Sequence, residues 1–287
     1  MENFDFLRSG AFIVDKNTNV TSRYVDNYFS KSLKYRKVGH LGTLDPFASG
    51  LLIVFVNEGT KLIPLFEDLD KEYVATLRLG SKTDTGDLDG TVIDKKDVPS
   101  LSKNEVKDYL ASLKGENFQI PPMYSAIKKD GVPLYKLARE GKEIDREQRR
   151  FYIHDIELLE LTVTTITFRV CVSKGTYIRT LGEDIAEHFG TVGYLTSLRR
   201  TRVGSFSVDN AKTIDVINNQ DLHGILELFA GFDKYSITSE EEKRKVKNAL
   251  PLELQFASSY VLIMSEGMPI AVYKKTDRIY SFLRGLN

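Results

Sequence analysis

The sequence has a single cysteine, no net charge and no apolar run long enough to cross a membrane, and each feature excludes a class of protein. With only Cys171, the chain cannot form an intramolecular disulfide and lacks the cysteines of a zinc finger. The longest apolar run, Leu51–Val56, is far shorter than the roughly 20 residues that span a bilayer. The first ten residues, MENFDFLRSG, have neither the basic start nor the apolar core of a signal peptide. We therefore expect a cytoplasmic protein without a membrane partner.

The composition is that of a globular protein with a substantial core. Its 287 residues are 41% hydrophobic, which is enough for one large domain or for a main domain with a small appendage. Lys and Arg together number 40, as do Asp and Glu, so the net charge gives no hint of an anionic partner. Local patches decide nucleic-acid binding, so this balance does not exclude it.

The periodicity of apolar residues predicts a large mixed α+β domain followed by a small β-rich one. Predicted strands cover residues 10–14, 51–57, 73–79, 151–160, 161–173 and 205–208, and three short ones follow at 260–264, 270–273 and 278–282. Predicted helices cover residues 21–34, 103–114, 134–139, 176–189, 191–198 and 221–230. Residues 121–131 are predicted to be extended, with a hairpin-like turn at Asp130-Gly131, and residues 239–249 to be a solvated, charged stretch.

One loop stands out, the stretch KVGHLGTLDPFASGLLIVF at residues 37–55. Pro46 pushes the backbone of Asp45 toward extended geometry, and three glycines allow sharp turns around it. An aspartate in such a loop is either a turn or N-cap residue or a carboxylate displayed at a strand edge for chemistry. The local sequence leaves both interpretations open.

His40 lies in the same loop, where it either satisfies backbone groups or contacts a ligand. The other histidines, His154, His188 and His223, are isolated in the sequence, without metal-ligand spacing. The turn TDTGDLDG at 83–90 resembles a calcium loop only superficially, because its acidic spacing is wrong. No metal site is predicted.

Basic residues gather in three places. They are Lys31, Lys34, Arg36 and Lys37; Lys128, Lys129, Lys136, Arg139, Lys142, Arg146, Arg149 and Arg150; and Arg199, Arg200 and Arg202. Each cluster alone is typical of a solvated face. Three of them, interleaved with tyrosines, favour a surface that follows a phosphate backbone.

Arg179 is predicted in the first turn of the helix at 176–189. A cation there opposes the helix dipole, so helix stability does not explain it. We expect either a carboxylate or phosphate partner, or an ordinary exposed arginine.

The segment GHLGTLDPFASGLL strongly resembles the catalytic motif of the TruB family of tRNA pseudouridine synthases. Three later blocks resemble those of the same family in the same order: RLGSKTDTGDLDG, IPPMYSAIKKDGVPLYKLAREG and SKGTYIRTLGEDIAEHFGTVGYLTSLRRTRVGSF. The resemblance covers about residues 10–210. It implies a pseudouridine-synthase fold, with a mixed, mostly antiparallel sheet flanked by helices and a small PUA-like RNA-binding domain. We place the catalytic domain at 1–235 and the small domain at 236–287.

The resemblance also assigns a role to six residues by their position in these motifs. It implies that Asp45 is the catalytic aspartate, Arg179 its partner, Tyr73 the tyrosine that stacks on the target base, Leu198 an apolar wall of the uracil pocket, His40 the histidine that helps to flip the base, and Lys16 the lysine after the first strand. The chain departs from the family at DKNTNVTS, where DKPxGxTS is usual. The missing proline and glycine are expected to loosen that turn.

The activity implied by the resemblance is isomerisation of uridine 55 in the T-loop of tRNA to pseudouridine, by a monomer without metal or cofactor. Two alternatives on the same scaffold are a guide-dependent synthase acting on another RNA and a non-catalytic tRNA-folding protein. A carboxylate-dependent glycoside hydrolase would need a second acid as proton donor, and the sequence pairs none recognisably with Asp45.

Overall fold

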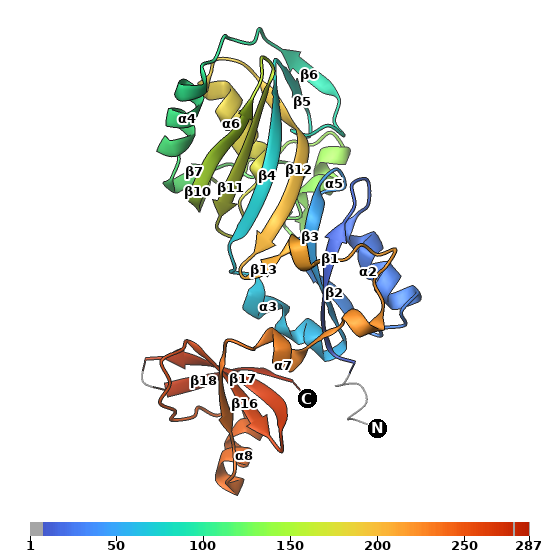
Figure 1. The fold of residues 1–287 in the computed structure, drawn as a ribbon, viewed down its shortest axis with the longest axis vertical. Coiled ribbons are helices and arrows are strands. Elements are labelled where there is room, and N and C mark those ends of the chain that lie inside the picture. Colours follow the sequence, from blue (N-terminus) through green and yellow to red (C-terminus); the bar gives the residue numbers. More distant parts are fainter. Residues whose placement is uncertain (1–7, 278, 287) are drawn as a thin grey trace.

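A computed structural model describes residues 8–277 and 279–286 (Figure 1). The signal-peptide prediction rests partly on residues 1–7, which lie outside this range. The molecule is elongated, with a large sheet above and a small sheet below (Figure 1). No helix of the described part is long and apolar enough to span a membrane.

The large sheet contains ten strands and runs in the order β14-β1-β3-β12-β4-β11-β10-β7, with β2 beside β3 and β13 beside β12. Their bounds are β1 (Gly10–Lys16), β2 (Val38–Leu41), β3 (Ser49–Val56), β4 (Lys71–Leu79), β7 (Gly115–Gln119), β10 (Arg149–Leu161), β11 (Thr165–Val172), β12 (Gly193–Val203), β13 (Phe206–Ser207) and β14 (His223–Gly224). All pairings are antiparallel except that of β3 with β12. The predicted α+β class with a mixed, mostly antiparallel sheet is confirmed.

Helices pack on both faces of this sheet. Their bounds are α2 (Ser22–Lys31), α3 (Ile63–Phe66), α4 (Lys103–Ser112), α5 (Leu134–Arg139), α6 (Ile178–His188), α7 (Ile225–Leu228) and α8 (Glu240–Lys247). In Figure 1, α6 lies behind the strands and α4 lies at their left edge; α6 contacts both β12 and β4, and α4 contacts β10. The charged stretch at 239–249 forms α8, which begins with a capping box between Ser239 and Glu242.

The helix predicted at 191–198 is wrong, because residues 193–198 belong to β12. The ladder with β4 shifts between Leu195 and Ser197, so the strand carries a bulge there. The extra residue puts Leu195 and Leu198 on the same face, and both are buried. Two apolar residues three positions apart are also the mark of a helix face, which is why periodicity misassigned the segment.

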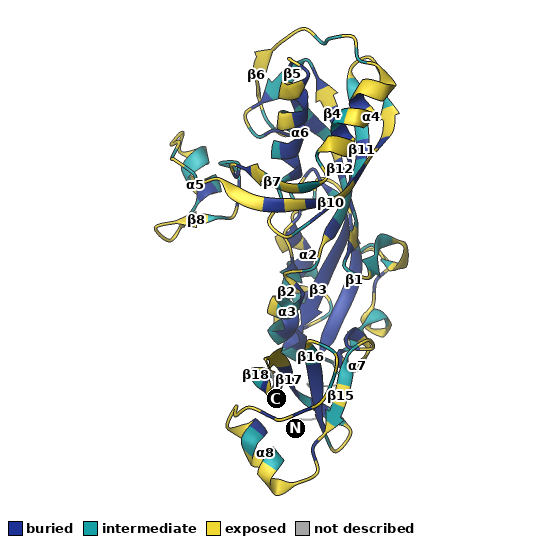
Figure 2. Ribbon diagram, turned by 90° about the vertical axis from the view of Figure 1, so that its left-hand side faces the viewer, coloured by how far each residue is buried: buried dark blue, intermediate teal, exposed yellow. Residues whose placement is uncertain are grey.

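A long connection between β7 and β10 projects from the body of the molecule (Figure 2). This connection, residues 120–148, is called the arm below. It holds α5 and the hairpin of β8 (Lys128–Lys129) and β9 (Val132–Pro133). Asp130 and Gly131 adopt left-handed φ angles of 52° and 81°, so the predicted turn is confirmed.

The small sheet has the order β15-β16-β17-β18. Its strands are β15 (Asp233–Ser236), β16 (Tyr260–Ser265), β17 (Met268–Thr276) and β18 (Ile279–Gly285). Leu262 and Val272 of this sheet share a buried cluster with Ile13 and Phe55 of the large one. The two sheets are therefore joined by apolar packing.

Gly50 provides a test of the junction between β3 and β12. Its φ is +100°, and a Cβ there would meet the Arg200 carbonyl oxygen at 2.3 Å. We expect Gly50→Ala to lower the free energy of unfolding by at least about 2–3 kcal/mol, through backbone strain and displacement of β12. Urea unfolding measures this loss. Gly231→Ala is the matched control, because open space surrounds Gly231, and equal losses in the two variants would contradict the expectation.

Candidate active site

Asp45 lies in the connection between β2 and β3, between two buried side chains. Leu44 and Phe47 are 3% and 2% exposed, whereas the Asp45 side chain is 37% exposed. Ser22 fixes the loop to the start of α2, since its hydroxyl accepts from Leu44 N at 2.9 Å and donates to Leu44 O at 3.0 Å. The loop thus presents the carboxylate with its neighbours held inward.

Arg179 meets this carboxylate. Its Nε lies 2.9 Å from Asp45 Oδ2, and its side chain is 5% exposed. Its Nη1 donates to the carbonyl of Thr85 and its Nη2 to that of Tyr124, both at 2.7 Å. The expectation of an anionic partner for a cation in the first turn of α6 is confirmed, and that partner is a carboxylate.

Asp87 is a second carboxylate at this arginine, and the sequence did not reveal it. Its Oδ2 lies 3.6 Å from Arg179 Nη1, and it is only 5% exposed. Its Oδ1 accepts from the Thr85 hydroxyl at 2.6 Å and from Asp89 N at 3.1 Å. Burial raises the pKa of Asp87, against the opposing effects of these hydrogen bonds and of Arg179. The turn at 83–90, which superficially resembles a calcium loop, thus holds Arg179 through Thr85 O and Asp87.

Lys16, at the end of β1, is 1% exposed and points inward. Its Nζ donates to the carbonyls of Asn17 at 2.9 Å and Val20 at 2.6 Å, and lies 3.5 Å from Pro46 O. Burial lowers its pKa to about 8, although the charge of Asp45 acts the other way. Lys16 therefore ties the turn after β1 to the Asp45 loop.

That turn is the DKNTNVTS segment. Asn19 adopts a φ of 61°, a left-handed conformation that asparagine tolerates better than most residues. Asn19 N also donates to Pro46 O at 2.8 Å. The turn is therefore held in place without the proline and glycine.

His40 belongs to strand β2, so its placement in a loop was wrong. Its Nδ1 lies 2.9 Å from Asp26 Oδ2, and its Nε2 lies 3.0 Å from Thr43 Oγ1. Asp26 comes from α2 and its side chain is 4% exposed. Both ring nitrogens thus have side-chain partners, which fix the orientation of the imidazole.

Tyr73 and Leu198 lie on neighbouring strands that continue the site. Leu198 of β12 pairs with Ala75 of β4, and Arg200 pairs with Tyr73, so these side chains share one face of the sheet. Leu198 is 6% exposed and Tyr73 is half-buried. Both strands therefore place an apolar wall on the face that α6 covers.

Arg200 contradicts the surface role predicted for its cluster. It is 1% exposed, and it donates from Nε to Leu51 O at 2.7 Å and from Nη2 to Gly42 O at 2.9 Å. Its neighbour Arg199 forms a two-bond ion pair with Asp15. Arg200 is a structural residue that holds both ends of the Asp45 loop against β12. In the clusters at 31–37 and 128–150, every basic residue except the half-buried Arg146 is exposed.

Comparison with known proteins shows which family the chain resembles. The family model described as "TruB family pseudouridylate synthase (N terminal domain)" matches residues 30–178, just over half of the chain. A tRNA pseudouridine synthase B of Hydrogenovibrio crunogenus is 43% identical over 215 residues, 75% of this chain and 71% of the relative. Another, from Francisella philomiragia, is 38% identical over 272 residues, 92% and 90% of the two chains.

Solved structures resemble the fold. A chain from a Cbf5-Nop10-Gar1 complex superimposes with a TM-score of 0.73 at 23% identity, over 98% of this chain and 86% of that one. A chain from an H/ACA RNP bound to a substrate RNA containing 2'-deoxyuridine gives 0.70 at 21% identity, over 100% and 87%. At these identities the likeness concerns the fold alone.

Replacing Lys16 by methionine tests its buried charge. Its pKa is about 8 in the folded chain and 10.5 as the reference value, so between these pH values the unfolded chain binds more protons. Stability contributed by this site therefore rises with pH across that window. We expect wild type to gain on the order of 1–2 kcal/mol of unfolding free energy over Lys16→Met from about pH 8 to pH 10. Urea unfolding at each pH gives the difference, and a difference independent of pH would contradict the assignment.

Proposed function

The chain belongs to the TruB family of pseudouridylate synthases, and from this premise we propose that it isomerises uridine 55 in the T-loop of tRNA to pseudouridine. The observation that carries the proposal is the contact between Asp45 Oδ2 and Arg179 Nε. A half-exposed carboxylate beside a buried guanidinium can act as a nucleophile, since the cation compensates for the hydration that the carboxylate loses.

The reaction breaks the bond between N1 of uracil and C1′ of the ribose, turns the base, and joins C5 to the same C1′. The proton on C5 leaves, N1 gains one, and no redox change occurs. Asp45 attacks either the base or C1′, and both routes need the same placement of its carboxylate. The hydroxyl of Tyr73 is the proposed acceptor of the C5 proton.

His40, Tyr73 and Leu198 are proposed to receive the flipped base. Extruding a nucleotide from a folded loop costs a few kcal/mol, and one stacked base returns roughly 1–3 kcal/mol. Tyr73 offers its ring for stacking and Leu198 an apolar wall. His40, oriented by Asp26, occupies the space that the base leaves.

The RNA surface is proposed to include the basic clusters at 31–37 and 128–150, so binding weakens as salt rises. We propose a catalytic domain that ends before β15 (Asp233–Ser236), rather than at the expected residue 235, because β15 pairs with β16 of the small sheet. The small domain from β15 onward is proposed to be PUA-like and to contact RNA. We propose a cytoplasmic enzyme that acts as a monomer.

A guide-dependent synthase and a tRNA-folding protein remain the alternatives. The presence of both Asp45 and Arg179 favours catalysis over the tRNA-folding protein.

Asp45→Asn keeps the shape of the side chain and removes its charge. We expect release of tritium from C5-labelled uridine in an unmodified tRNA transcript to fall on the order of 10⁴-fold or more, with RNA affinity preserved. Asp215→Asn, at an exposed position, should leave the rate unchanged. Residual turnover near the wild-type rate would falsify the role of Asp45, and product mapping in wild type tests position 55 separately.

Arg179→Lys tests the geometry of the cation. A lysine keeps the charge but cannot reach Asp45 and the carbonyls of Thr85 and Tyr124 at once. We expect kcat to fall roughly 10²-fold with a smaller change in KM. Arg169→Lys, at an exposed ion pair with Glu157, is the matched control. If kcat of Arg179→Lys stays as close to the wild-type value as kcat of Arg169→Lys, the positive charge alone is sufficient and the expectation is contradicted.

A further inference from the structure

Asp26 is a buried carboxylate that takes no part in the bond changes of the reaction. It belongs to α2, and its side chain is 4% exposed. Its two oxygens lie 3.1 and 2.9 Å from Nδ1 of His40, its one hydrogen-bond partner among the described residues. Arg23 Nη1 is 3.6 Å away, but the Arg23 side chain is 75% exposed and contributes little. Burying a charge with a single donor lowers stability, and such arrangements persist mainly at functional sites.

Helix α2 holds both ends of the segment that precedes Asp45. Ser22 and Asp26 are four residues apart in this helix, so they lie on the same face of it. The Ser22 hydroxyl bonds to the backbone of Leu44, and Asp26 bonds to His40. The helix also packs against β2 (Figure 1). The segment from His40 to Leu44 is therefore fixed at both ends by one helix.

The contact with Asp26 determines where the His40 ring carries its hydrogen. A carboxylic acid gives up its proton far more readily than an imidazolium, so the hydrogen between Asp26 and Nδ1 lies on the ring. In the neutral ring Nε2 then has no hydrogen, and it accepts from the Thr43 hydroxyl, whose Oγ1 is 3.0 Å away. Thr43 is exposed, so the Nε2 edge of the ring is the one nearer to solvent and to an approaching RNA.

We propose that Asp26 is a positioning residue for extrusion of the target uridine, which keeps the hydrogen of His40 on Nδ1 and holds the ring in one orientation. The proposal rests on the proposed function, in which His40 occupies the space that the base leaves. A ring that is already fixed loses little conformational freedom when RNA binds, so more of the contact energy is available to extrude the base.

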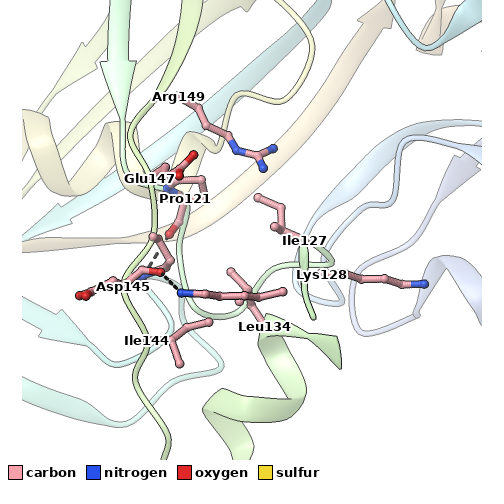
Figure 3. A pocket seen from close by; sticks show the side chains of 10 residues that line it. Pro121, Ile127, Lys128, Leu134, Ile144, Asp145, Glu147 and Arg149 are labelled. Carbon is pink, nitrogen blue, oxygen red and sulfur yellow. Dashed lines mark hydrogen bonds between the residues drawn. The ribbon is translucent and has the colours of Figure 1, made fainter. Parts of the chain in front are cut away.

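This role is separate from that of the arm. A cavity of about 200 Å³ lies at the base of the arm, and its lining includes Pro121, Leu134 and Arg149 (Figure 3). Neither Asp26 nor His40 lines that cavity. The effect of Asp26 on the RNA therefore passes through His40.

Proton–nitrogen NMR of the free protein reads the position of the ring hydrogen. In buffer alkaline enough to keep an imidazole neutral, we expect the hydrogen of His40 on Nδ1 in wild type and a mixture of the two forms in Asp26→Leu. The chain has four histidines, so comparison with His40→Gln assigns the signal. A wild-type ring with its hydrogen on Nε2 would overturn the inference.

Two variants of Asp26 separate the orientation of the ring from the charge beside it. Asp26→Leu removes the acceptor, whereas Asp26→Asn keeps an acceptor oxygen without the charge. A fluorescent purine analogue next to the target uridine reports extrusion, because its emission rises when its neighbour leaves the stack. We expect Asp26→Leu to slow extrusion and single-turnover tritium release about tenfold, with RNA affinity within about threefold of wild type.

Asp26→Asn should keep both rates within about threefold of wild type, because the ring still has an acceptor. An asparagine variant as slow as the leucine variant would show that the charge matters and not the orientation, and would overturn the inference.

A double-mutant cycle distinguishes positioning from a general loss of structure. If Asp26 acts through His40, Asp26→Leu slows extrusion by less than about twofold when His40 is already alanine. Equal losses in both backgrounds would overturn the inference. Asp108→Asn is the matched control, since Asp108 is exposed on α4, a helix as long as α2. It should leave every rate unchanged, and circular dichroism confirms that each variant is folded.

The two proposals fail in different ways. Absence of tritium release by wild type would overturn the proposed function, whereas the position of the ring hydrogen is read from the protein without RNA. Normal turnover without coupling between Asp26 and His40 would overturn only the positioning role.

Discussion

Between Arg179 and Asp45 lies a contact that joins distant parts of the chain, and most of the site is arranged around the buried guanidinium. Its hydrogen bonds to Thr85 O and Tyr124 O fix the turn at 83–90 and the base of the arm. Asp87 adds a second negative charge at 3.6 Å. A buried charge left without partners is costly, so the fold must bring all of these segments to their places together. The Asp45 loop, the turn at 83–90 and the arm are thus coupled through one side chain.

Two further buried cations, Lys16 and Arg200, hold the backbone around Asp45. They bind carbonyl oxygens rather than carboxylates, from Asn17 and Val20 in one case and from Gly42 and Leu51 in the other. Of the two, Lys16 also interacts with the charge of Asp45, whereas Arg179 is the cation that contacts both Asp45 and Asp87.

The sequence predicted the elements whose residues follow one periodicity. β3 is a continuous apolar run and α6 has one apolar face, and both were found. β12 was missed because a bulge gives its buried leucines a helical spacing. The motifs singled out Asp45 and Arg179 as candidate site residues. The helix-dipole argument predicted an anionic partner for Arg179. Nothing local distinguishes Asp87 from other acids of its turn, or the buried Arg200 from the exposed Arg202, because burial there depends on which strands become neighbours.

The pairing of β3 with β12 joins residues 49–50 to residues 199–200, and it is completed late in synthesis. The chain folds from its N-terminal end as it leaves the ribosome, so Asp45 and its loop are exposed well before Arg179, Leu198 and Arg200 exist. During that interval the loop lacks its Arg200 hydrogen bonds and the carboxylate lacks its cation. A nascent chain therefore carries the Asp45 loop before the residues that complete the site, and the site is assembled only when the fold is nearly whole.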